Sequence, residues 1–208
     1  MRIRITFSKT EAMRFTGHLD LYRTWERTLR RAQLPLAYSQ GFNPHPRINL
    51  ASALPLGFTS QEDIVDVGLE QNLAAPEIET ALRQAAPPGI RIDRVQVIDD
   101  HLPTLQAVLE ASEFTITFLE PFPELDARLA ELLGAESLPR ERRGKSYDLR
   151  PLVLELRRLP DDEQGQRRLF ARLAAREGAT GRPEEVIAAL GEAPERTRVH
   201  RTRLVFKE

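Results

Sequence analysis

Two neighbouring segments, Arg2-Ile-Arg-Ile-Thr-Phe7 and His18-Leu-Asp-Leu-Tyr-Arg-Thr-Trp-Glu-Arg-Thr-Leu-Arg-Arg-Ala-Gln33, indicate the architecture of the chain. In the first, Ile3, Ile5 and Phe7 alternate with polar residues, which predicts a strand from Arg2 to Phe7. In the second, apolar residues recur with the period of a helix, so we predict a helix from His18 to Gln33. A strand followed by an amphipathic helix begins a mixed α and β unit.

The rest of the N-terminal half extends this start to the order βαββαβ. Pro76 with Glu77 and Glu79 favours a helix start, and Pro87-Pro88-Gly89 ends that helix. The further predicted elements are strands Arg47 to Ser52 and Asp63 to Leu69, helix Pro76 to Ala85 and strand Ile90 to Ile98.

The C-terminal half repeats the same order. Its predicted elements are strand Ser112 to Leu119, helix Pro123 to Leu133, strands Leu152 to Arg158 and Arg167 to Arg176, helix Pro183 to Leu190 and strand Thr197 to Phe206. Matching features of the two halves lie 105 to 107 residues apart, which suggests an internal duplication. We therefore predict an α+β protein of two tandem ferredoxin-like (βαββαβ) domains with antiparallel sheets, residues 1–100 and 105–208, joined near Asp99 to Thr104.

Composition narrows the class of protein. With 208 residues and 41% hydrophobic residues, the chain can build an ordinary core, and no apolar run reaches the length of a membrane span. The N-terminus alternates like a strand and has no part of a secretory signal, so we expect a soluble cytoplasmic protein. Cysteine is absent, which excludes disulfides, thiolate zinc sites and iron–sulfur clusters ligated by this chain.

Charge is distributed unevenly, although the net charge is only −1. Residues 1–50 hold nine Arg or Lys against three Asp or Glu, residues 51–110 hold three against ten, and residues 111–208 hold eighteen of each. Lys9, Lys145 and Lys207 are the only lysines, so arginine supplies nearly all the positive charge. The guanidinium fork suits phosphate recognition, and a GC-rich or thermophilic genome is the alternative explanation.

The predicted helix from His18 to Gln33 separates an apolar face from an arginine face. At 100° per residue the arginine face holds Arg23, Arg27, Arg30 and Arg31. Glu26 lies at its margin and Asp20 at the helix start, so we expect that i,i+4 pairs cannot neutralise four guanidinium groups. Uncompensated positive charge is typical of a surface that binds a polyanion, and a solvated helix face is the alternative interpretation.

The loops on either side of this helix supply further candidates for RNA binding. Lys9 and Arg14 add positive charge beside the helix N-terminus, which already favours anions. The loop from residue 34 to 46 is stiffened by two prolines and presents four more candidates: Tyr38, Phe42, Asn43 and His45. Tyr38 and Phe42 can stack on bases, or Phe42 can plug the loop into its own domain.

A third basic segment, Pro139 to Pro151, connects the first helix of the second half to the next strand. It contributes Arg142, Arg143 and Lys145 to the predicted RNA-binding set. We interpret it as a flexible basic loop, for which simple solvation is the alternative.

Three sequence motifs resemble a known family. The run Arg14-Phe-Thr-Gly-His-Leu-Asp-Leu, the run Arg30 to Pro46 with its Gly-Phe-Asn-Pro-His-Pro core, and Ala53-Leu-Pro-Leu-Gly are similar to the radical-SAM-linked small proteins, a domain of unknown function. The resemblance implies a partner enzyme that carries a [4Fe-4S] cluster and S-adenosylmethionine, since this chain has no cysteine and is expected to bind no cofactor or metal itself. It also implies a link to RNA metabolism.

The duplicated architecture is similar as well to the tandem ferredoxin-like endoribonucleases that process CRISPR repeats. That likeness implies a metal-independent cleavage in which His18 is catalytic. From the residues themselves, His18 and His45 are candidates for a general acid and base, or for metal ligands together with Asp20. The glycine-rich loop of those enzymes is represented here only by Gly178 and Gly181.

We therefore expect a non-catalytic accessory module that binds tRNA or rRNA and presents it to a radical-SAM partner. The endoribonuclease is one alternative. A purely protein-binding adaptor, which would use the acidic segment Glu62 to Asp100 or the helix arginines, is the other.

Overall fold

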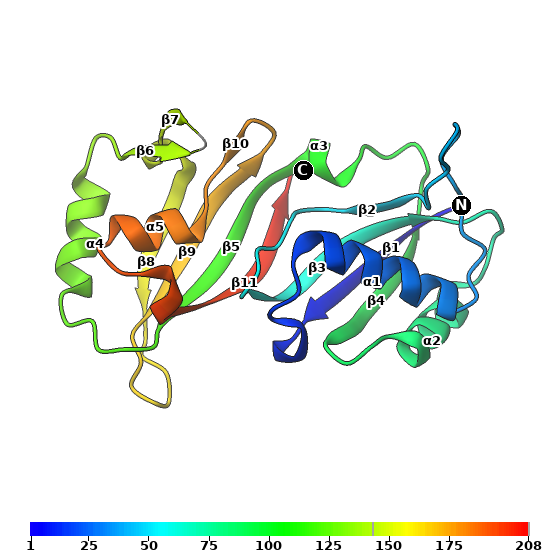
Figure 1. Cartoon of the computed structure of the whole chain (residues 1–208), viewed down its shortest axis with the longest axis horizontal. Helices are drawn as coiled ribbons and strands as arrows, with labels where there is room; N and C mark the ends of the chain where they lie inside the picture. Colours follow the sequence, from blue (N-terminus) through cyan, green and yellow to red (C-terminus); the bar gives the residue numbers. More distant parts are fainter. Residues whose placement is uncertain (143, 208) are drawn as a thin grey trace. The chain divides into compact units, whose positions relative to one another are not determined.

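The computed structural model describes residues 1–142 and 144–207 and divides into two compact units, Met1–Val108 and Leu109–Glu208 (Figure 1). Each unit combines α-helices with antiparallel strands, which confirms the predicted α+β class. The junction predicted near Asp99 to Thr104 is hydrogen-bonded to the N-terminal unit, because Arg2 donates to the backbone oxygens of Leu102 and Pro103. None of the described helices has both the length and the apolar character needed to cross a membrane.

Unit 1 has one sheet of four antiparallel strands. Its elements are β1 (Arg2–Lys9), the 3-10 turn η1 (Glu11–Met13), α1 (His18–Arg31), β2 (Ile48–Leu50), β3 (Thr59–Gly68), α2 (Ala75–Ala85), β4 (Ile90–Ile98) and the short α3 (Leu105–Val108). β1 pairs with β3 on one side and β4 on the other, and β2 pairs with β3, so the order across the sheet is β2-β3-β1-β4.

Both long helices of unit 1 cover the same face of this sheet. Ile3, Ile5 and Phe7 alternate along β1 and are completely buried, as the sequence pattern predicts. They share one core with Trp25 of α1 and Ile78 of α2. The ring of Trp25 meets that of Phe7 edge to face at 4.8 Å between centroids. The remaining side of α1 is left for solvent or a ligand.

Unit 2 repeats this arrangement. Its elements are β5 (Leu109–Phe118), α4 (Leu125–Gly134), β6 (Pro139–Arg142), β7 (Lys145–Asp148), η2 (Arg150–Leu152), β8 (Val153–Leu159), β9 (Arg168–Arg176), β10 (Ala179–Thr180), α5 (Pro183–Ala189), η3 (Pro194–Arg196) and β11 (Thr197–Phe206). Pairing gives the order β8-β9-β5-β11, and all pairs are antiparallel. In chain order these strands correspond to β2, β3, β1 and β4 of unit 1.

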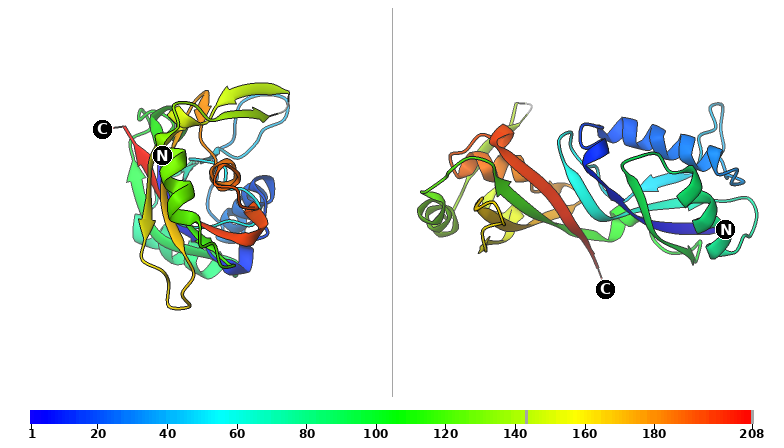
Figure 2. Two further views of the ribbon diagram at one scale, coloured as in Figure 1. Left: turned by 90° about the vertical axis from the view of Figure 1, so that its left-hand side faces the viewer. Right: turned by 90° about the horizontal axis from the view of Figure 1, so that it is seen from below.

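The structure differs from the sequence prediction at two connections that concern function. α1 ends at Arg31, and Gln33 then adopts a left-handed conformation (φ 56°), with its amide bonded to Arg30 O and the amide of Leu34 bonded to Leu29 O. The segment predicted as a flexible basic loop instead contains the β6–β7 hairpin, which stands out from unit 2 in Figure 2.

Candidate nucleic-acid interface

Two arginines on the outer face of α1 have carboxylate partners on the same helix. Arg30 lies 2.7 Å from Glu26 and Arg23 lies 3.5 Å from Asp20, at i,i+4 and i,i+3 spacing. The expectation that all four guanidinium groups lack such partners is therefore wrong for these two. Both arginines are solvent-exposed, and ion pairs at the surface contribute about 0–1 kcal/mol. A phosphate group can therefore compete for either guanidinium at little cost.

The other two arginines of α1 behave differently from each other. Arg31 donates a hydrogen bond to the backbone oxygen of Ala85 at 3.0 Å, which ties the end of α1 to α2. Arg27 is exposed at the middle of the outer face and forms no ion pair or hydrogen bond within the described residues. We call Arg23, Arg27 and Arg30 the α1 surface.

The loop before α1 is held together by Lys9, which is not available to a ligand. Lys9 is completely buried, and its Nζ donates to the backbone oxygens of Thr16 (2.8 Å) and Arg14 (3.3 Å). Arg14 is also largely covered, with its Nε bonded to Gly57 O at 2.9 Å. The sequence prediction that Lys9 contacts RNA is not compatible with this burial. Phe15, next in the chain, is 75% exposed.

The loop after α1 forms a small hairpin that exposes Phe42. Tyr38 and Pro46 pair at its base, the amide of Ser39 donates to His45 O (2.9 Å), and the amide of His45 donates to Ser39 Oγ (3.0 Å). We call residues 39–45 the Phe42 loop. Phe42 is fully exposed at its tip, which excludes the alternative that this ring plugs the loop into the domain.

The Phe42 loop is fastened to the flank of α1. Tyr22 Oη donates to Pro46 O at 3.3 Å, and burial, helped by nearby Glu26, raises the pKa of Tyr22 above its usual value. Asn43 is exposed beside Phe42. In Figure 2 the light-blue loop extends beside the end of α1. The α1 surface and an exposed aromatic ring therefore belong to one connected part of unit 1.

The two candidate catalytic histidines differ in exposure. His18 is the first residue of α1 and is half-buried, whereas His45 is exposed in the Phe42 loop. Within residues 1–142 and 144–207, no cluster of three or more His, Asp or Glu side chains is arranged to hold a metal ion. Whether His18 takes part in cleavage stays a prediction.

In unit 2 the basic hairpin packs on the start of α5. Burial raises the pKa of Tyr147, with Glu185 as a smaller cause, and Tyr147 is hydrogen-bonded to Glu185. Burial and the nearby Arg142 lower the pKa of Arg182. Arg182 was absent from the sequence prediction because it stands alone between Gly181 and Pro183. Lys145 is exposed, and Arg143 lies outside the described residues.

Comparison with known families gives one match over most of the chain. Residues 2–183 match the family described as an uncharacterized protein conserved in bacteria (DUF2344). The chain belongs to this family. The domain of unknown function suggested by the sequence motifs is thereby confirmed. Among curated proteins, none matches the chain.

Two solved structures resemble the fold. A chain of the "Cbf5-Nop10-Gar1 Complex" aligns with a TM-score of 0.53 at 12% identity, over 97% of this chain and 48% of that chain. A chain of the "archaeal box H/ACA sRNP Nop10-Cbf5 complex" aligns with a TM-score of 0.49 at 14% identity, over 99% and 49%. The present chain spans about half the length of these relatives. At such identities the likeness concerns the fold alone.

Proposed function

We propose that the chain is a non-catalytic RNA-binding module, which binds a tRNA or rRNA on the α1 surface and the Phe42 loop and presents it to a radical-SAM partner enzyme. The observation that carries the proposal is Arg27, an exposed guanidinium without a partner in the described structure, between two arginines whose exposed ion pairs are weak. Phosphates are the natural ligands of such a group. Phe42 adds a ring on which an unpaired base can stack.

The partner is proposed from the sequence motifs. Because the chain has no cysteine, the iron–sulfur cluster and S-adenosylmethionine would be held by the partner.

Beyond the α+β class, we infer that each unit has a ferredoxin-like fold. It is supported by the βαββαβ order of the main elements and by the shared strand orders β2-β3-β1-β4 and β8-β9-β5-β11.

The test is filter binding of purified tRNA and rRNA fragments over a salt series. The test variant is Arg27→Ala with Arg30→Ala. We expect at least a tenfold loss of affinity and a slope of log K against log salt that is shallower by about 2, because two phosphate contacts are removed.

Unit 1 offers a closely matched control, Arg83→Ala with Arg94→Ala. Arg83 pairs with Glu79 at i,i+4 and 2.8 Å on α2, as Arg30 does with Glu26 on α1, and the two arginines have similar exposure. Arg94 is exposed and has no ion pair in the described structure, like Arg27. If both double variants bind RNA equally, the α1 surface is not the binding site.

A protein-binding adaptor is the second candidate, and one observation favours it. Phe15 and Leu19 are 75% and 72% exposed at the N-terminal end of α1, and Leu56 nearby in the fold is 62% exposed. Exposed apolar residues in a group are typical of protein interfaces. Co-purification of a protein partner that survives nuclease treatment and is lost with Leu19→Ser would support the adaptor.

The endoribonuclease stays a prediction from the sequence. Its test is incubation of the purified protein with RNA in the presence of EDTA.

A further inference from the structure

Unit 1 contains a pocket at the base of the Phe42 loop. Its volume is about 440 Å³, and it lies among the start of β1, the start of β2, the end of β3 and the segment 100–104. Volumes of about 300–1,000 Å³ are usual for sites that hold small molecules. The pocket is lined mainly by polar groups and includes Ser39 and His45 of the Phe42 loop, but the proposed function assigns no ligand to it.

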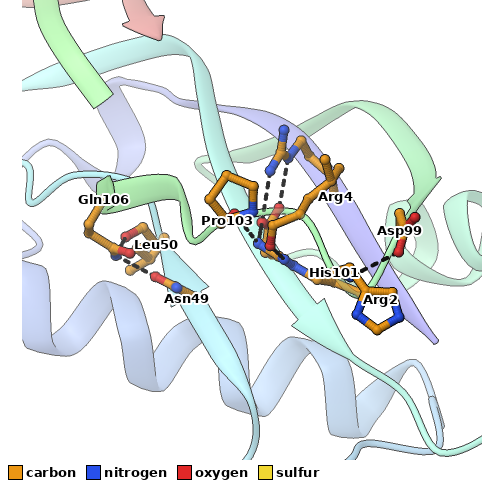
Figure 3. A network of polar contacts seen from close by, with 10 residues as sticks. Arg2, Arg4, Asn49, Leu50, Asp99, His101, Pro103 and Gln106 are labelled. Atoms are coloured by element: carbon orange, nitrogen blue, oxygen red, sulfur yellow. Dashed lines mark hydrogen bonds and ion pairs between the residues drawn. The ribbon is translucent and has the colours of Figure 1, made fainter. Parts of the chain in front are cut away.

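An ion-pair network fixes one side of the pocket. Asp66 is 2% exposed and accepts hydrogen bonds from Arg4 (2.8 and 2.9 Å) and Arg2 (2.6 Å). Arg2 also donates to the backbone oxygens of Leu102 (2.7 Å) and Pro103 (3.1 Å), as Figure 3 shows. These bonds attach the segment 100–104 to β1, so this wall is formed before any ligand binds.

A second attachment completes the preformed wall. The side chain of Gln106 donates to Asn49 Oδ1 and to the backbone oxygen of Leu50 (Figure 3). The side-chain amide nitrogen of Asn49 and the hydroxyl of Thr104 form no hydrogen bond within the described structure, and both residues line the pocket. The pocket therefore offers free polar groups on rigid elements.

Arg47 is the cation that the fold places at this pocket without a partner. Its amide donates to Ala37 O (2.9 Å) and its oxygen accepts from the amide of Gly68 (2.8 Å), so its backbone is fixed. A Cβ on Gly68 would stand 3.1 Å from Arg47 Cβ, which shows how closely the arginine stem lies on β3. Among the described residues its guanidinium forms no ion pair or hydrogen bond.

The charges of the pocket fit one phosphodiester. Arg2 and Arg4 against Asp66 leave one positive charge and Arg47 adds a second, while Asp100 is balanced by the amino group of Met1. The Asp100 carboxylate lies 3.5 Å from the amino nitrogen of Met1 and is 61% exposed, so it can still accept hydrogen bonds. A carboxylate and an amide are the groups that read the amino and imino edges of bases.

We propose that this pocket holds one unpaired nucleotide of the bound RNA, with its phosphate on Arg47 and its base or ribose on Asn49, Asp100 and Thr104. The inference rests on the proposed function and names the part of the RNA that this site takes. The exposed ring of Phe42, on the loop that also contributes His45 to the pocket, is then available to stack on the next base.

The experiment is an NMR titration of the full chain with adenosine 5′-monophosphate, cytidine 5′-monophosphate, adenosine and inorganic phosphate. We expect the nucleotides to shift the amide signals of Arg47, Asn49 and Thr104. Arg47→Ala should weaken nucleotide binding at least tenfold and leave adenosine binding unchanged, while Arg47→Lys retains part of it. Arg94→Ala, an exposed arginine of the same unit outside the pocket, should have no effect.

Three outcomes would overturn the inference: no shift at these amides, an equal loss in Arg94→Ala, or inorganic phosphate that binds as tightly as the nucleotides. Failure here is distinguishable from failure of the proposed function. Arg27→Ala with Arg30→Ala should lose RNA and keep nucleotide binding. If tRNA binds through the α1 surface while no nucleotide enters the pocket, only the pocket assignment fails.

Discussion

The first helices of the two units hold the same position in the same strand order, yet their surface charge differs. α1 carries four arginines and two acidic residues, whereas α4 carries one arginine and two acidic residues. That single arginine, Arg128, lies 3.7 Å from Glu124 and 3.6 Å from Glu131, while Arg27 of α1 has no carboxylate partner in the described structure. The fold is common to both units, so side chains rather than architecture distinguish α1 as the proposed binding element.

The two sheets carry a pair of opposite charges at the corresponding place, with the signs exchanged between the strands. Arg4 of β1 lies opposite Asp66 of β3, and at the corresponding place in unit 2 Glu113 of β5 lies opposite Arg172 of β9. Directly opposed charges of opposite sign stabilise an antiparallel pair. In unit 1 the side chains of Asp66 and Arg4 are 2% and 24% exposed, whereas in unit 2 those of Glu113 and Arg172 are 10% and 41% exposed. The unit 1 pair is therefore the more deeply buried of the two.

The largest effect is expected when each carboxylate is removed. Asp66→Ala should lower the free energy of unfolding by about 3 kcal/mol, because two largely covered guanidinium groups lose their shared partner. Glu113→Ala should cost about 1 kcal/mol, since Arg172 can be hydrated. Urea unfolding followed by circular dichroism measures both. Fluorescence of Trp25, the single tryptophan, reports unit 1. Equal losses would contradict the burial argument.

A smaller effect is expected at the two exposed aromatic residues on either side of α1. Phe42→Ala should weaken RNA binding by about 1–2 kcal/mol through lost stacking, with no change in unfolding, because the ring has no contacts to lose. Phe15→Ala is the matched variant, and the RNA proposal expects little change there. If Phe15→Ala removes a protein partner while Phe42→Ala leaves RNA binding intact, the adaptor replaces the RNA-binding module.

The order of the main elements could be predicted from the sequence, whereas the β6–β7 hairpin could not. Alternation in Arg2 to Phe7 and the helical period of α1 reflect burial on one face, so the order of elements followed from the sequence. The β6–β7 hairpin was taken for a loop because none of the residues in its two strands is buried and it lacks apolar alternation. A local pattern of apolar residues arises where side chains are buried. This hairpin buries too little for such a pattern to appear in the sequence.

The site residues were harder to predict, because a sequence shows which residues are charged but not which groups they contact in the fold. Lys9 looked like a ligand for phosphate, but the turn after β1 brings two backbone oxygens to its ammonium group. Arg47 was assigned to a strand and not to a site. Its place at the pocket depends on Gly68, distant in sequence, whose missing side chain leaves room for the arginine stem. Only the pairing of β2 with β3 brings the two together.

The smallest effect is expected just beyond the ends of two helices, where the same left-handed cap is formed by a glutamine in one case and a glycine in the other. Beyond the end of α1, Gln33 adopts φ 56°, and beyond the end of α5, Gly191 adopts φ 86°. In both cases the next amide bonds back to the fourth residue before the left-handed one. Glycine adopts this conformation without strain, and glutamine does not. Gln33→Gly should therefore raise the free energy of unfolding by about 0.5–1 kcal/mol, and Gly191→Gln should lower it by about 1 kcal/mol.

Thermal and urea unfolding measure both changes, with Gln33→Ala as the control that keeps a side chain and should gain nothing. The sign at Gln33 matters more than the size, because a loss of side-chain contacts would lower stability in Gln33→Gly, whereas relief of backbone strain raises it. The α1 surface ends before Gln33, so its RNA affinity should stay the same in the stabilised variant. A change in affinity would mean that the direction of the chain after α1, and with it the Phe42 loop, depends on this cap.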